Sequence, residues 1–239
     1  MNSYSYSALK DFATCQKQFY YVRFTRAVRR KYDGAGEGKA IHAAIEMALK
    51  HGESDLPSKF RQYNWVLARL EKVKERMAKD RPTGITFTHA EFGCTVMPDW
   101  TLGAPFSKNG FYTCFIDLVL ERDDIAYITD WKTGKSGYAD LDQLYQQAMV
   151  LFLAKPNIMT IRADLTYIKE DLQVPAIPLR IERGQLIDLQ HDVIRLADRV
   201  ARKDPNDPED WEASPSGLCP YCPLTKDHCV HSDKEGAAK

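Results

Sequence analysis

Phe115-Ile116-Asp117-Leu118-Val119 and Ile128-Thr129-Asp130-Trp131-Lys132 are the two stretches of the sequence that decide the fold. Each has the composition of a β-strand, and the polar pair Asp123-Asp124 lies between them as a turn signal. We therefore predict strands over residues 111–122 and 125–132. A tight turn between them makes the two strands antiparallel neighbours.

The length of that turn decides which side chains face each other. A two-residue or a four-residue loop places Asp117 directly opposite Asp130, whereas an odd-length loop does not. Directly opposed Cα atoms lie roughly 4.5–5.5 Å apart, and like charges so placed destabilise a sheet. A divalent cation reverses this effect, because hard cations such as Mg²⁺ seek carboxylate oxygens.

Lys132 adds a positive charge to the two carboxylates. It lies two residues after Asp130 and therefore projects from the same face of the strand. Two carboxylates and an ammonium group on one pair of strands indicate a metal-assisted site for phosphodiester chemistry. The alternative is a salt bridge on a solvated strand face, which the cross-strand partner Asp117 makes the weaker interpretation.

The overall composition is that of an ordinary soluble globular protein. The chain has 239 residues, 44% hydrophobic and 28% charged, which suffices for one large domain or two small ones. No apolar stretch is long enough to span a membrane and no signal peptide is visible, so we expect a cytoplasmic protein. The 33 basic and 33 acidic residues cancel, which neither supports nor excludes a nucleic-acid partner.

A local basic run is more informative than the net charge. Its members are Arg23, Arg26, Arg29, Arg30 and Lys31, with Phe24 and Tyr32 among them. Such a run can follow a phosphate backbone, and we consider it a candidate DNA-binding segment. The alternative is a solvated helix end.

Three of the six cysteines, Cys219, Cys222 and Cys229, lie close together in the sequence. In a cytosolic chain such clustering favours a metal or iron–sulfur site over disulfides. Cys94 and Cys114 lie in strand-like segments and have the character of small buried hydrophobic residues. Cys15 therefore remains as the fourth thiolate, although a helix stripe that includes it also fits a core position.

The spacing of these cysteines leaves the cofactor open. Zinc could be held by four cysteines, or by three together with His228 or His231, and an iron–sulfur cluster fits as well. A site that joins Cys15 to residues 219–229 would close nearly the whole chain into one loop, and this long closure would strongly stabilise the fold.

Periodicity along the chain predicts alternating helices and strands. Helices are expected over residues 7–22, 39–51, 57–80, 139–154 and 184–202. Strands are expected over 85–97, 111–122, 125–132, 161–169 and 177–182. This order indicates an α/β or α+β architecture with a mixed sheet.

Taken in order, these pieces resemble the PD-(D/E)XK nuclease superfamily, specifically its RecB-like branch with a four-cysteine iron–sulfur cluster. The resemblance extends from Ser5 to Cys229. Its motifs are the segment from Ser7 to Cys15, the helix from Gly38 to Glu46, Ile116-Asp117, Asp130-Trp131-Lys132-Thr133-Gly134, and Gln143 to Leu151. This sequence departs from the family at Cys114, where glycine is usual, at Gln147, where tyrosine is usual, and in a longer last cysteine gap.

The resemblance implies a restriction-endonuclease-like α/β fold, a mixed central sheet flanked by helices. It further implies one nuclease domain over residues 1–239, with N- and C-terminal segments joined at a [4Fe-4S] cluster. In that arrangement 1–32 and 203–232 form the iron–sulfur subdomain. Residues 39–202 form the nuclease core, with a helical insertion at about 55–82.

The resemblance also implies roles for individual residues. The catalytic residues are Asp117, Asp130, Lys132 and Gln143. The Mg²⁺ or Mn²⁺ ligands are His42, Asp117, Asp130 and the backbone carbonyl of Trp131, with Glu91 as a further candidate. The cluster ligands are Cys15, Cys219, Cys222 and Cys229, with Zn²⁺ as the alternative cofactor.

The expected function is therefore a metal-dependent DNA exonuclease that acts on free or single-stranded ends in recombination, repair or phage DNA processing. One alternative is a CRISPR-adaptation nuclease that trims spacer precursors. Another is a non-catalytic, zinc-stabilised nucleic-acid-binding module. The setting would be the cytoplasm of a bacterial, archaeal or phage-infected cell, with recombination or CRISPR proteins as candidate partners.

Overall fold

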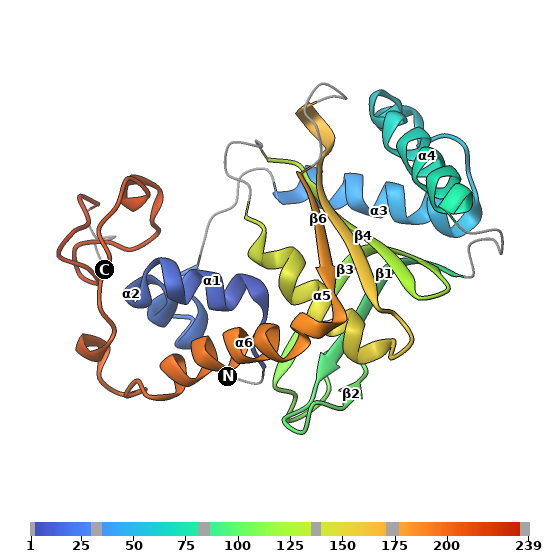
Figure 1. Ribbon diagram of the computed structural model, residues 1–239. Helices are drawn as coiled ribbons and strands as arrows, with labels where there is room; N and C mark the ends of the chain where they lie inside the picture. Colours follow the sequence, from blue (N-terminus) through green and yellow to red (C-terminus); the bar gives the residue numbers. More distant parts are fainter. Residues whose placement is uncertain (1–2, 30–34, 81–86, 135–139, 171–176, 235–239) are drawn as a thin grey trace. The chain divides into compact units, whose positions relative to one another are not determined.

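The structure is a computed structural model that describes residues 3–29, 35–80, 87–134, 140–170 and 177–234 (Figure 1). The chain divides into two compact units. One combines residues 1–33 with residues 191–239, and the other is residues 34–190. Among the described residues, no helix has the length and apolar character that crossing a membrane requires.

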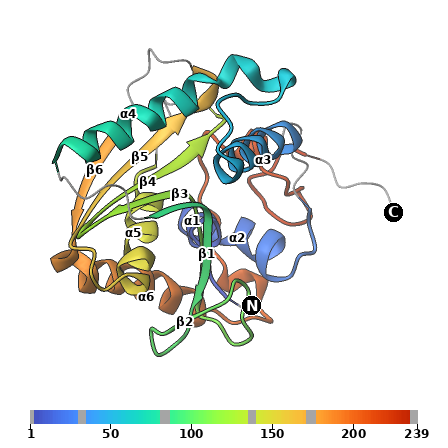
Figure 2. The same cartoon turned by 90° about the vertical axis from the view of Figure 1, so that its right-hand side faces the viewer.

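A six-stranded mixed sheet forms the centre of the unit 34–190, and this confirms the predicted mixed sheet flanked by helices. The spatial order is β2-β1-β3-β4-β5-β6, with only β4 and β5 parallel (Figure 2). The strands are β1 (Phe87–Val96), β2 (Leu102–Gly103), β3 (Tyr112–Arg122), β4 (Ile125–Lys132), β5 (Thr160–Tyr167) and β6 (Ile177–Glu182). The two-residue β2 was not predicted, because so short a segment leaves no periodicity to detect.

The β3–β4 hairpin has the predicted two-residue turn. Arg122 pairs with Ile125 and Leu118 pairs with Thr129. Asp123, the first turn residue, has φ +53°, a left-handed conformation that Asp tolerates better than most residues. Continued by one residue, this register sets position 117 opposite position 130, as the alternation of the sequence predicts.

Helices cover both faces of the sheet. They are α3 (Ala35–His51) and α4 (Trp65–Asp80) on one face and α5 (Asp142–Ala154) on the other (Figures 1 and 2). The predicted helix 57–80 begins instead as a 3-10 turn, Ser58–Tyr63. The interruption follows from Asn64, whose side chain bonds the Leu56 N–H at 2.8 Å and the Asp55 carboxylate.

A hydrophobic cluster joins α3 and α4 to one face of β3 and β4. It includes Ile41, Ile45, Leu70, Leu118 and Trp131, all nearly inaccessible to solvent. Trp131 is therefore a core residue. Because side chains alternate along a strand, Asp130 and Lys132 point to the opposite face, toward α5.

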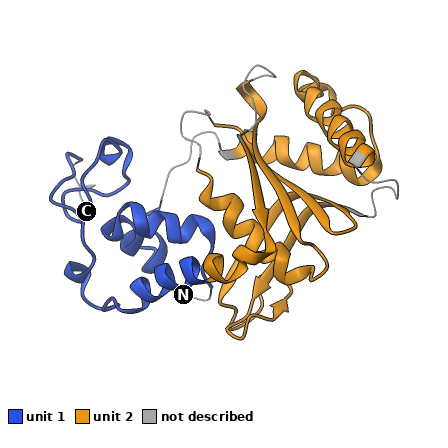
Figure 3. Cartoon of the chain, viewed as in Figure 1, with its two compact units in different colours: residues 1–33, 191–239 blue, residues 34–190 orange. Residues whose placement is uncertain are grey.

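The other unit brings the two ends of the chain together (Figure 3). Its helices are α1 (Tyr6–Thr14), α2 (Gln16–Phe19), a π-helical turn (Tyr20–Phe24) and the later part of α6 (Leu186–Ala201), followed by 3-10 turns at Pro208–Asp210 and Cys219–Tyr221. The predicted helix 7–22 is broken at Cys15, which is extended with φ −161° and ψ 111°. Trp211 is fully buried at the centre of this unit, against the rings of Phe12, Phe19, Tyr20 and Phe24.

Candidate active site and cysteine cluster

Asp130 is the most buried carboxylate of the candidate site, with 5% of its surface exposed. Its Oδ2 lies 2.6 Å from the Lys132 Nζ. Its Oδ1 accepts hydrogen bonds from the side-chain amides of Gln143 and, at 3.0 Å, Gln147. Burial, followed by the negative charge of Asp117, raises the pKa of Asp130 to about 6 despite these donors.

Asp117, on the neighbouring strand, is held from two sides. Its Oδ2 accepts a 2.7 Å hydrogen bond from the backbone N–H of Trp131. Its Oδ1 lies 3.6 Å from Nδ1 of His42, which α3 supplies. Burial lowers the pKa of His42, but the hydrogen bond and charge of Asp117 outweigh burial, so the net shift is upward. The structure thus places His42 beside Asp117.

Two glutamines of α5 converge on the same carboxylate oxygen. Gln143 and Gln147 are one helical turn apart, so they lie on one face of the helix. Gln143 also accepts a hydrogen bond from the Lys132 ammonium, and so bridges Lys132 and Asp130. Gln147 additionally donates to the Phe115 carbonyl at 3.0 Å. The sequence singled out Gln143, whereas Gln147 looked like a departure from the family pattern.

Glu91 does not join the carboxylates in a shared ligand set. It lies in β1 with φ +57°, exposed, where the ladder to β3 skips from the Ala90–Leu118 pair to the Phe92–Ile116 pair. Among the described residues, no group of three or more His, Cys, Asp and Glu side chains is placed to hold a metal. Two carboxylates still suit Mg²⁺, which usually takes one or two from the protein and keeps several waters.

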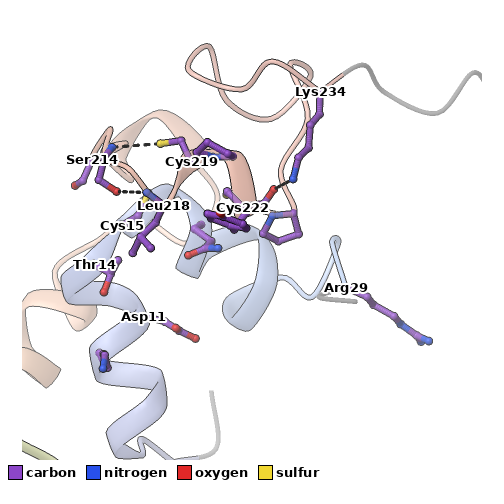
Figure 4. A pocket seen from close by; sticks show the side chains of 15 residues that line it. Asp11, Thr14, Cys15, Arg29, Ser214, Leu218, Cys219, Cys222 and Lys234 are labelled. Carbon is purple, nitrogen blue, oxygen red and sulfur yellow. Dashed lines mark hydrogen bonds between the residues drawn. The ribbon is translucent and has the colours of Figure 1, made fainter. Parts of the chain in front are cut away.

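Three of the predicted cluster ligands line one cavity of about 890 Å³ in the unit 1–33 and 191–239 (Figure 4). They are Cys15, Cys219 and Cys222. Burial, and then the charges of the other three thiols including Cys229, raise the pKa of Cys222. The Sγ of Cys219 accepts the Ser216 N–H at 3.3 Å. Sulfur donors are the ligands that soft metals and iron–sulfur clusters prefer, but among the described residues these thiols do not form a group of three or more that is placed to hold a metal.

Cys94, Cys114 and the candidate zinc ligand His228 are not among the residues that line this cavity. Cys94 and Cys114 are buried and face each other across β1 and β3, as expected of small hydrophobic residues. Burial raises the pKa of Cys94 to about 11. His228 Nδ1 lies 2.9 Å from the Thr225 hydroxyl, and its ring packs on Tyr21.

The basic run is not a uniform patch. Arg23 is paired with Asp11 at 2.7 Å, so its charge is balanced. Arg26 and Arg29 are exposed, and Arg29 is one of the residues that line the cavity beside Cys15, Cys219 and Cys222 (Figure 4). Arg30 and Lys31 lie outside the described residues.

A family model identifies the superfamily of this chain. The model of the PD-(D/E)XK nuclease superfamily matches residues 3–229. The chain belongs to the PD-(D/E)XK nuclease superfamily. Membership makes it a nuclease-fold protein with a nucleic acid as the expected substrate, and PD-(D/E)XK nucleases generally use divalent metals.

Solved structures similar to this PD-(D/E)XK chain are distant. A candidate exonuclease from Eubacterium rectale is similar over 84% of this chain and 80% of its own, with 15% identity and a TM-score of 0.46. The protein SSO0001 is similar over 93% of this chain and 83% of its own, with 10% identity and a TM-score of 0.35. A search of the curated proteins found no match. The family assignment rests on the match over residues 3–229.

A buried polar network lies on the opposite face of the nuclease sheet from Asp130. Its centre is Asp164 on β5, which is 4% exposed. The Asp164 carboxylate accepts from Arg69 at 2.8 Å and from the hydroxyls of Tyr127, Thr129 and Thr166 at 2.6, 2.6 and 3.0 Å. The network therefore ties α4 and β5 to β4, directly behind the strand that carries Asp130 and Lys132. Nothing in the local sequence pattern indicated it.

Proposed function

We propose that this chain is a divalent-metal-dependent DNA nuclease of the RecB-like branch, with its active site at Asp117, Asp130 and Lys132. The observation that carries the proposal is the meeting of two carboxylates from adjacent strands, one buried with a raised pKa, beside an ammonium group. Two neighbouring carboxylates repel each other, and Lys132 is the counter-ion of Asp130 alone. Perturbed carboxylates of this kind are typical of functional sites.

The residues that would hold the metal are Asp117 and Asp130, with His42 and the Trp131 carbonyl as further ligands. When bound, the cation would polarise the scissile phosphate and activate the attacking water. Glu91 remains a candidate for an outer position, because its left-handed backbone interrupts the ladder opposite Asp117.

The chain's own side chains would orient the two carboxylates, contact the DNA and stabilise the charge that develops on the phosphate. The Lys132 ammonium, fixed between Asp130 and Gln143, would face the negative charge that develops on the phosphate. His42 would hold Asp117 in place through its Nδ1. Gln147 would fix the orientation of Asp130. Arg26 and Arg29 are the exposed members of the proposed DNA-binding run among the described residues, and there they would contact the phosphate backbone.

Cleavage of labelled DNA with Mg²⁺ or Mn²⁺ tests this chemistry. Asp117→Asn, Asp130→Asn and Lys132→Met should each lower the rate by about a hundredfold or more. Asp123→Asn is the matched control, because it removes a carboxylate from the turn of the same hairpin and Asn also tolerates the left-handed conformation. Cleavage that persists in the three site variants rules out the assignment.

We further propose that the enzyme is an exonuclease, acting in recombination, repair or phage DNA processing. The test compares a linear substrate with a covalently closed circle and with a linear molecule whose ends are blocked. An exonuclease degrades only the first of these. Efficient nicking or linearisation of the circle would show an endonuclease instead.

The four thiols of Cys15, Cys219, Cys222 and Cys229 are proposed to hold a [4Fe-4S] cluster that joins the two ends of the chain. Anaerobically purified protein should be brown and contain about four irons and four sulfides per chain. Cys222→Ser should lower this content and the melting temperature together. If the purified protein is colourless and contains one zinc ion per chain, the result would support the zinc alternative instead of the cluster.

A further inference from the structure

Two exposed aromatic rings lie beside the proposed active site. Phe106 and Phe115 are 76% and 40% exposed, and their ring centroids are 5.6 Å apart at an angle of 44°. Phe115 precedes Asp117 by two residues in β3, so both side chains leave the same face of the sheet about 7 Å apart along the strand. The ring pair therefore borders the carboxylates.

The strand next to β3 leaves room for the Phe115 ring. Gly93 is the cross-strand partner of Phe115. A Cβ atom at position 93 would come within 2.6 Å of Phe115 Cε1, so any larger residue would displace the ring. The Phe115 carbonyl also accepts the Gln147 amide that bonds Asp130. The aromatic residue and the buried carboxylate thus share one positioning side chain.

Phe106 occupies a backbone position that favours glycine. The Ser107 N–H and hydroxyl both bond the Ala104 carbonyl, at 3.1 and 2.7 Å, and close a turn with Pro105 in its second position. Phe106 follows with φ +63°. Proline followed by a residue of positive φ is the pattern of a type II turn, in which the third residue is normally glycine.

A contribution to folding stability does not explain why position 106 is a phenylalanine. A phenylalanine in a left-handed conformation is strained, and a ring that is 76% exposed recovers little by packing. Strain that persists at an exposed position beside an active site points to a function for the side chain. An exposed aromatic face close to a phosphate-cleaving site is suited to stacking on a nucleobase.

We propose that Phe106 and Phe115 stack on an unpaired base of the substrate strand, next to the phosphate that is cleaved. In a duplex the faces of a base are covered by its neighbours, whereas an unpaired base at a single-stranded end presents a free face. The protein would therefore prefer single-stranded ends, without reading their sequence. This inference rests on the proposed nuclease function and names its substrate class.

The test uses Phe106→Gly, which removes the ring and relieves the left-handed strain. We expect a melting temperature at or above that of the wild type, and roughly tenfold weaker binding of a single-stranded oligonucleotide. Phe106→Trp should retain the binding. Asn109→Gly is the matched control, because Asn109 also has positive φ in the same loop but carries no ring.

A set of oligonucleotides that each lack one base identifies the stacked nucleotide. For the wild type, one abasic position should weaken cleavage about as much as Phe106→Gly does. In the Phe106→Gly variant that abasic position should have no further effect, since ring and base act as one pair. Additive losses, or equal cleavage of single strands by wild type and variant, would overturn the stacking proposal.

The proposed nuclease function and the stacking proposal would be refuted by different results. If wild-type protein cleaves no DNA with either metal, the nuclease function is wrong. If wild-type protein cleaves and Asp130→Asn does not, but Phe106→Gly leaves single-strand binding unchanged, only the stacking proposal is wrong. A clear fall in the melting temperature of Phe106→Gly also counts against stacking, because it would assign the ring to packing.

Discussion

Replacing Asp130 by asparagine should abolish cleavage and yet stabilise the metal-free protein at neutral pH. The folded protein raises the pKa of this carboxylate from 3.8 to about 6. Each pH unit of such a difference corresponds to about 1.4 kcal/mol, so the ionised Asp130 costs the folded state roughly 3 kcal/mol. Asparagine has nearly the same shape and carries no charge, so it avoids this cost.

Because folding raises the pKa of Asp130, the stability gained by Asp130→Asn depends on pH in a defined direction. Below about pH 3.8 the carboxyl is neutral in both the folded and the unfolded chain, and the variant has no advantage. The unfolded chain ionises first as the pH rises, so the advantage of Asp130→Asn grows between about pH 4 and 6. Above about pH 6 both states are ionised, and the advantage stays at its full value.

Urea unfolding of both proteins in EDTA, at several values between pH 5 and 8, measures this difference. Asp123→Asn is again the control, because it removes an exposed carboxylate from the turn of the same hairpin. Mg²⁺ should then stabilise the wild type more than Asp130→Asn, because a ligand stabilises only the state that binds it. If Asp130→Asn is less stable than the wild type at pH 8 in EDTA, the reasoning from buried charge is refuted.

Three other substitutions test the candidate site, the polar network around Asp164 and the core of the unit that contains the cysteines. Gln147→Leu removes a donor to Asp130 and should move the acidic limb of the pH–rate profile upward, whereas Gln146→Leu on the same helix should leave that limb in place. Asp164→Ala leaves Arg69 and three hydroxyls without their acceptor, and should cost about 3–5 kcal/mol in urea unfolding; a loss below 1 kcal/mol contradicts the network. Trp211→Ala should cost about 3–5 kcal/mol in the unit that contains the cysteines, and an unchanged melting temperature contradicts its role as the core of that unit.

The hairpin that carries Asp117 and Asp130 could be predicted from the sequence because its information is local. A turn of two residues and a period of two along each strand fix the register. The same reasoning placed Lys132 on the face of Asp130. His42 could not be placed by local reasoning, since its distance from Asp117 depends on how α3 packs on the sheet; only the resemblance to the family suggested it.

The features that the sequence did not reveal depend on contacts between distant segments. Asp164 meets Thr129 because β4 and β5 are parallel neighbours, and a parallel pairing follows from the crossover through α5 and not from any turn signal. The break at Cys15 lies inside a helix-like pattern of apolar residues. The positive φ of Glu91 and of Phe106 likewise goes against the local preference of both residue types.

The contacts of Lys132 would allow the proposed cation and the ammonium group to share the candidate site. Lys132 is the counter-ion of Asp130, at 2.6 Å from Oδ2. Lys132 also donates to Gln143, so it keeps one partner if Oδ2 is taken by a cation. Because Asp130 must first lose its proton, and its pKa is about 6, metal affinity should rise with pH up to about 6 and then level off. Calorimetric titration of Mn²⁺ between pH 5 and 8 measures this, and an affinity independent of pH would show that Asp130 is not a ligand.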